Sequence, residues 1–157
     1  MNLFGMMDAS GEAMEAERMR AEVVAANMAN AETTRTATGG PYHRQHVVFA
    51  ANRGDAGFLN SLSAAVLPSN PLPLPGAASV APGVHIVQVV QDPAPPLKRY
   101  DPGHPDAGPD GYVAYPDINP LTEMVDLMGA TRAYGLNGSA VQAEKSMIGS
   151  ALDIAKS

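Results

Sequence analysis

The first 30 residues separate into a charged side and an apolar side when they are placed on a helical wheel. The charged side holds Asp8, Glu12, Glu15, Arg18 and Glu22. The opposite side holds Met6, Ala9, Ala13, Met14, Ala21, Val24 and Met28. Such a division is typical of an amphipathic helix that buries one face against a partner. We predict a helix from Leu3 to Asn30.

A second helical pattern occupies the C-terminal end. Asn119 and Pro120 form a start signal, because asparagine caps free N–H groups and proline fits the first helical position. Glu123 lies in the first turns, where the helix dipole favours an acid. We predict a helix from Pro120 to about Ala155.

The C-terminal helix carries an apolar seam with a mean spacing of 3.5 residues, which follows a left-handed supercoil. The seam consists of Met124, Leu127, Thr131, Tyr134, Gly138, Val141, Lys145, Ile148, Leu152 and Ala155. A helix of about 35 residues is roughly 50 Å long, whereas a compact globule made from the whole chain has a diameter of about 40 Å. Part of this helix must therefore pack against the N-terminal helix or against another molecule.

Four glycines interrupt the predicted C-terminal helix: Gly129, Gly135, Gly138 and Gly149. Each one weakens a helix by about 0.5–1 kcal/mol relative to alanine. Two interpretations stay open, because glycines are either tolerated weak points or positions where a neighbouring helix approaches closely.

The middle of the chain cannot be helical, because 13 of the 14 prolines lie between Pro68 and Pro120. Short runs rich in Val, Ile and Tyr predict strands at residues 42–49, 84–90 and 111–115. Residues 54–83 are almost uncharged and rich in proline, which indicates an extended loop or a proline-rich recognition motif.

These elements predict an α+β fold in three parts. Residues 1–36 form an N-terminal helix and a following motif, residues 37–118 a small β domain, and residues 119–157 a C-terminal helix. The two long helices are expected to form a coiled-coil-like core.

Composition excludes several function classes. The net charge is -6 and Lys and Arg do not cluster, which argues against nucleic-acid binding. Cysteine is absent, so disulfides and thiolate chemistry are unavailable. The first residues have no basic segment followed by an apolar run, which predicts export, if it occurs, without a cleaved Sec signal peptide.

No catalytic, cofactor or metal site is predicted. His43 and His46 are three residues apart in an expected strand, so their side chains point to opposite faces. The acids between Asp101 and Gly111 lack the spacing of a calcium loop, and prolines and glycines there indicate a rigid turn. Motifs for nucleotide binding and for a serine nucleophile are missing, so a small-molecule substrate is not expected.

The segment from Asn27 to Thr33 is the most distinctive local feature. Asn27 and Asn30 share one helix face, where both amides can bond to a partner's backbone. Asparagine and threonine are also common where a helix ends. Both interpretations are compatible with the sequence.

Four stretches carry a resemblance to known proteins. Ala26-Asn-Met-Ala-Asn-Ala-Glu-Thr33 resembles the A-N-x-x-N-x-x-T motif of flagellar rod and hook proteins. Three further stretches are similar to the FlgC family of flagellar rod proteins. They are Thr33-Thr-Arg-Thr36 with Gly39-Gly-Pro-Tyr42, then Asp92-Pro-Ala-Pro-Pro96 with Tyr100-Asp-Pro-Gly-His-Pro-Asp-Ala107, then Gly111-Tyr-Val-Ala-Tyr-Pro-Asp-Ile-Asn-Pro120 with Glu123-Met-Val-Asp-Leu-Met128.

The resemblance implies a structural subunit of the proximal rod in the flagellar basal body, and not an enzyme. Its implied partners are copies of itself, other rod proteins, the adaptor between rod and membrane ring, and the flagellar type III export apparatus. The family pattern has helix formers where this chain has Gly135 and Gly138, so a bend of the helix is expected there.

Subunit contacts are expected at the apolar seam and at the asparagine motif. The candidate interface residues are Val24, Asn27, Met28, Asn30, Thr33, Met124, Leu127, Tyr134, Asn137, Val141, Ile148 and Leu152. The alternatives are an axial protein of another branch, a helical adaptor outside the flagellum, and an enzyme that opens the cell wall.

Overall fold

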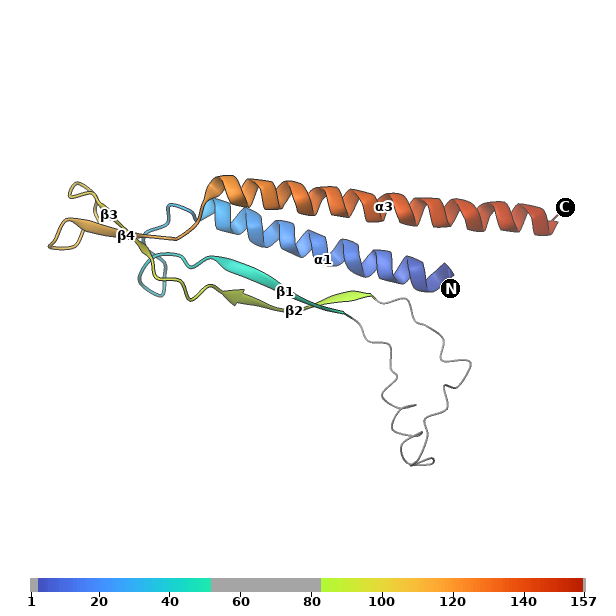
Figure 1. Cartoon of the computed structure of the whole chain (residues 1–157), viewed down its shortest axis with the longest axis horizontal. Helices are drawn as coiled ribbons and strands as arrows, with labels where there is room; N and C mark the ends of the chain where they lie inside the picture. The colour runs from blue at the N-terminus through green and yellow to red at the C-terminus, as the bar shows by residue number, and fades with distance from the viewer. Residues whose placement is uncertain (1–2, 52–82, 157) are drawn as a thin grey trace, which may run out of the picture.

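Two long antiparallel helices form the frame of the molecule (Figure 1). The computed structural model describes residues 3–51 and 83–156, so most of the predicted proline-rich loop lies outside the described residues. Helix α1 spans Leu3–Ala29 and helix α3 spans Pro120–Lys156. Both agree with the predicted helices to within one residue at each end. The N–H of Leu121 donates to the Asn119 side chain at 3.0 Å, which confirms the predicted cap.

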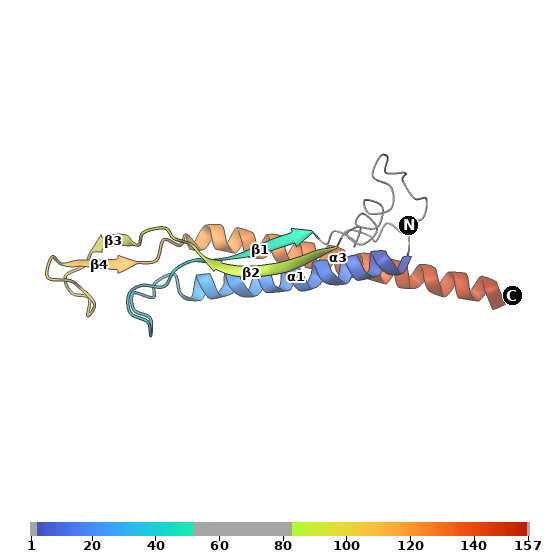
Figure 2. The same cartoon turned by 90° about the horizontal axis from the view of Figure 1, so that it is seen from below.

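A two-stranded ribbon lies along α1 on the side away from α3. Strand β1 (Gln45–Ala51) pairs antiparallel with β2 (Val84–Gln91), with an irregularity between Val48 and Phe49. Both strands contact α1 and neither contacts α3, which makes α1 the middle of three layers (Figures 1 and 2).

A second ribbon extends beyond the end where α1 stops and α3 begins (Figure 1). It consists of β3 (Leu97–Tyr100) and β4 (Tyr112–Tyr115), and the loop between them is the predicted turn. The sequence failed to predict β3, because prolines precede it and Lys98 and Arg99 make it polar. The prediction for β1 began three residues early, because the residues before Gln45 make side-chain contacts to the helices.

The buried core is small. The buried apolar residues of the described part are Ala16, Val23, Val24, Val113, Ile118 and Ala130. In the same part of the chain, 19 large apolar side chains are exposed, nine of them on α3. None of the described helices is both long enough and apolar enough to span a membrane.

The predicted seam of α3 consists of two parallel lines of residues, each with a spacing of seven. The residues that α3 buries in the structure differ from the prediction along one of these lines. Leu127, Val141 and Ile148 are half-buried, but the other buried line consists of Glu123, Ala130 and Glu144 instead of Met124, Thr131 and Lys145. The prediction was wrong by one residue on this line because hydropathy alone excludes glutamates from a seam. A glutamate is tolerated in a seam most easily when a specific partner satisfies its carboxylate, as for Glu123.

Glycines on α3 do not interrupt it, and the helix continues through Gly135 and Gly138 (Figure 1). A Cβ at Gly135 would meet nothing within 4 Å, whereas one at Gly138 would lie 3.9 Å from the sulfur of Met14. We expect Gly135→Ala to raise the free energy of unfolding of the purified chain by about 0.5–1 kcal/mol, measured by urea denaturation.

Gly111 serves as the comparison for Gly135, because we expect its replacement by alanine to have the opposite effect on the free energy of unfolding. Its φ is +71°, and a Cβ there would lie 2.8 Å from the ring of Tyr100. Gly111→Ala is expected to lower the free energy of unfolding by about 1–3 kcal/mol, because it combines backbone strain with a steric clash. Equal effects of Gly111→Ala and Gly135→Ala would contradict both assignments.

Candidate functional site

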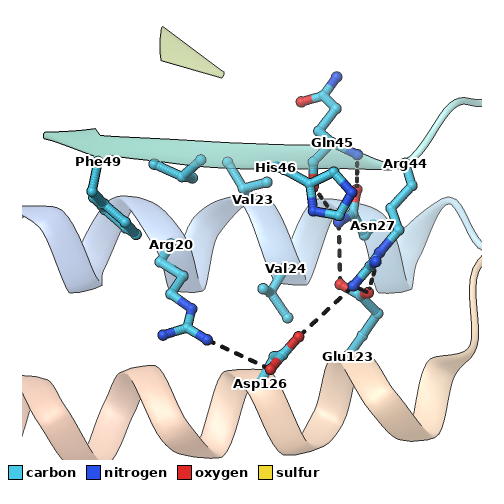
Figure 3. A pocket seen from close by; sticks show the side chains of 11 residues that line it. Arg20, Val23, Val24, Asn27, Arg44, Gln45, His46, Phe49, Glu123 and Asp126 are labelled. Carbon is cyan, nitrogen blue, oxygen red and sulfur yellow. Dashed lines mark hydrogen bonds and ion pairs between the residues drawn. The ribbon is translucent and has the colours of Figure 1, made fainter. Parts of the chain in front are cut away.

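The side chain of Asn27 joins α1 to the start of β1 and to α3 (Figure 3). Its Oδ1 accepts from the Gln45 N–H at 2.9 Å, and its Nδ2 donates to the Gln45 carbonyl at 2.9 Å. Nδ2 also donates to Glu123 at 3.1 Å, and the Tyr42 hydroxyl donates to Oδ1 at 3.2 Å. All four hydrogen-bonding positions of the amide are used, and Asn27 is 1% exposed.

We call this bonded group the junction, and it consists of Asn27, Tyr42, Arg44, Gln45 and Glu123. Glu123 is its second central member. Its carboxylate is buried, and Oε1 accepts from Nε of Arg44 at 2.6 Å while Oε2 accepts from Asn27. Arg44 reaches from the chain before β1, past α1, to α3 (Figure 3). A buried carboxylate needs a cation and hydrogen bonds to offset its loss of water, and Glu123 has both. The junction thereby fixes the three layers to one another.

Charged residues continue the junction along a groove of about 360 Å³ beside α1. Asp126 lies 3.7 Å from Arg44 and 3.5 Å from Arg20, which closes a network of alternating charges (Figure 3). The four charged side chains among the described residues of the groove, Arg20, Arg44, Glu123 and Asp126, thus compensate one another.

The environment of Tyr42 favours its neutral form. Burial and, secondarily, the nearby Glu123 carboxylate raise the pKa of the Tyr42 phenol. The hydroxyl therefore keeps the proton that it donates to Asn27.

The second asparagine of the motif has a different role. Asn30 donates from Nδ2 to the carbonyl of Ala26 at 2.9 Å and accepts from the Thr33 hydroxyl at 3.2 Å. These bonds satisfy groups at the end of α1, as expected of a helix stop. Thr34 then donates to Asp106 at 2.9 Å, which connects the motif to the loop between β3 and β4.

An apolar stripe runs along an exposed face of α3. We call it the outer stripe, and it consists of Leu136, Ala140, Ala143, Met147, Ala151 and Ile154. All six residues are exposed, and Leu136 and Ile154 are 66% and 76% exposed. Their spacing of three and four residues places them on one face over about 27 Å of helix. Figure 1 shows that α3 also continues past the N-terminal end of α1.

The predicted interface residues fall into three groups in the structure. Val24 and Asn27 are buried within the subunit. Met28, Asn30, Thr33, Leu127, Asn137, Val141 and Ile148 are half-buried. Met124, Tyr134 and Leu152 are exposed.

Sequence reasoning missed Tyr42, Arg44, Gln45 and Glu123 as members of a site. From the sequence, Glu123 is recognisable only as a residue of the first helical turns, because hydropathy does not indicate that a glutamate is buried. The described residues contain no group of three or more His, Asp or Glu side chains arranged to hold a metal.

Comparison with known proteins identifies the class. A family model described as "Flagellar basal body rod FlgEFG protein C-terminal" matches residues 110–154, which comprise β4 and nearly all of α3. Flagellar basal-body rod protein FlgC of Borreliella burgdorferi is 34% identical over 98% of this chain and 98% of its own length. FlgC of Bacillus subtilis is 35% identical over 99% of this chain and 100% of its own length.

The C-terminal part of the chain thus matches a family of flagellar basal-body rod proteins. FlgC of Escherichia coli O6:H1 is also similar, with 33% identity over 94% of both chains. The chain belongs to the FlgC family of flagellar basal-body rod proteins. This is a family of structural proteins and not of enzymes.

Proposed function

We propose that this chain is a structural subunit of the proximal rod and that it joins neighbouring subunits mainly through exposed faces of α3. The observation that carries this proposal is the outer stripe. Monomeric proteins rarely leave such a contiguous apolar face in water, and a face of this kind is typical of a protein–protein interface. In an axial structure each subunit is surrounded by neighbours, so the outer stripe of a rod subunit can pack against another subunit.

The interface proposed here extends the residues predicted from the sequence. Met124, Tyr134 and Leu152 contact a neighbour directly, because their side chains are exposed. Val24 and Asn27 support assembly indirectly, because they hold α1, β1 and α3 in one arrangement. The group of half-buried residues, from Met28 to Ile148, contributes at the edge of the interface.

The finer elements of the function also belong to this proposal. The partners are copies of this chain, other rod proteins and the adaptor that links the rod to the membrane ring. The subunit reaches its place through the flagellar type III export apparatus, without a cleaved Sec signal peptide. The assembled rod crosses the periplasm and transmits torque, which requires stiff subunits and supports a role for the paired helices.

Complementation tests this proposal. A strain that lacks its own copy of this gene should swim when it expresses the wild-type chain, and the chain should copurify with isolated basal bodies. A wild-type chain that restores no motility and is absent from basal bodies would exclude the rod role. Reading the position of the chain in a density map of the basal body would test the proximal placement separately.

A further inference from the structure

One carboxylate oxygen of the helix pair is buried without a hydrogen-bond partner among the described residues. Glu144 is 6% exposed, and its Oε2 is buried without a hydrogen-bond partner. Across residues 3–51 and 83–156, no side chain forms an ion pair with it. An ionised carboxylate in such a position destabilises the subunit unless something else compensates it.

The contrast with Glu123 is informative because both glutamates lie on the same buried line of α3. Glu123 has an arginine and an amide as partners, whereas Oε2 of Glu144 has no hydrogen-bond partner among the residues that the structure describes. The two residues are 21 positions apart, three heptads, so they occupy equivalent places in the seam. The described residues therefore satisfy the buried carboxylate of Glu123 at one end of the helix pair, but they leave one oxygen of Glu144 unpartnered near the other end.

The surroundings of Glu144 on α3 indicate the direction of the missing partner. Val141 and Ile148, three residues before and four after it, belong to the α1-facing seam. Ala140 and Met147, four before and three after it, belong to the outer stripe. Glu144 thus lies on the border between the two faces. Ala140 and Ala143, which lie beside it, are exposed and have short side chains.

We propose that Glu144 binds a lysine or arginine side chain of a neighbouring rod subunit whose helix lies on the outer stripe. This inference rests on the proposed function and adds the chemistry of the partner: an aliphatic helix with one cation among its apolar residues. The apolar stripe attracts the neighbouring helix, and the single buried acid fixes its register. A charge that is costly in the free subunit becomes compensated only when the correct neighbour is in place.

Two measurements on the same variants test this inference. Glu144→Met and Glu144→Gln remove the charge, so the melting temperature of the purified chain should rise by about 2–6 °C. Incorporation into basal bodies, measured by quantitative immunoblot, should fall about tenfold because the neighbour's cation then lacks its partner. Asp153→Asn is the matched control: it removes an exposed acid from the same helix and should leave both readouts within error.

The outcomes are distinguishable. A lower melting temperature for both variants would mean that Glu144 has a stabilising partner within its own chain, and would overturn the inference. A higher melting temperature with normal incorporation would also overturn it, because Glu144 would then be a tolerated flaw. Loss of incorporation by the wild-type chain would instead refute the proposed function itself.

A charge reversal identifies the partner residue. Glu144→Lys should prevent motility, and selected suppressors should change a lysine or arginine of a rod protein to an acid. Suppressors that never alter a cation in repeated selections would contradict a direct ion pair.

Discussion

Leu136→Glu is expected to reduce incorporation of the subunit into the basal body by about 100-fold, because burying an uncompensated charge opposes docking by several kcal/mol. Leu136 is 66% exposed and lies on the outer stripe. The purified variant should therefore keep the helix content of the wild type, measured by circular dichroism at 222 nm. Its strain should fail to swim.

Two further variants make this result specific. Gln142→Glu adds the same side chain at another exposed position of α3 and should permit normal swimming. Leu127→Glu places it against α1, where Leu127 is half-buried, and should lower the stability of the free subunit as well as assembly. Normal swimming with Leu136→Glu would mean that the outer stripe does not contact a neighbour.

Asn27→Ala is expected to lower the free energy of unfolding by about 2–4 kcal/mol, because it deletes four hydrogen bonds and leaves the Gln45 peptide and Oε2 of Glu123 without the amide that bonds to them. Asn27→Asp should be at least as damaging. It removes the two N–H donors and places a second carboxylate beside buried Glu123. Urea denaturation of the purified chain measures both.

Asn30→Ala is the matched control within the same motif. Its bonds are to the carbonyl of Ala26 and to Thr33 at the end of α1, so its loss should cost only about 0.5–1 kcal/mol. Similar losses for Asn27→Ala and Asn30→Ala would contradict the separate roles that the structure gives to the two asparagines.

The junction and the outer stripe have complementary roles in this subunit. The junction fixes the ribbon of β1 and β2 against α1 and fixes α1 against α3, although few apolar residues are buried. Such specific polar bonds can hold a thin subunit in one arrangement while most of its apolar surface stays available. That division suits a protein whose remaining packing is completed by its neighbours in the rod.

Local sequence signals determined the two helices and their ends. Helical periodicity and the Asn119 cap depend on residues within a few turns of each other, so they can be read without knowledge of the fold. The strand that begins at Val84 is also predictable, because a local run of Val and Ile indicates it. The motifs around Asn27 and after Tyr100 are also local, and they indicate the FlgC family by resemblance.

The tertiary structure alone decided how the two glutamates of the seam are used. The bond between Asn27 and Glu123 joins residues that are 96 positions apart. Whether a buried glutamate has a partner depends on which distant side chains the fold brings to it, and hydropathy has no information about that. For the same reason the sequence pattern placed one line of the seam at Met124 instead of Glu123. Hydropathy also does not indicate that Glu144 is buried with one carboxylate oxygen unpartnered among the described residues.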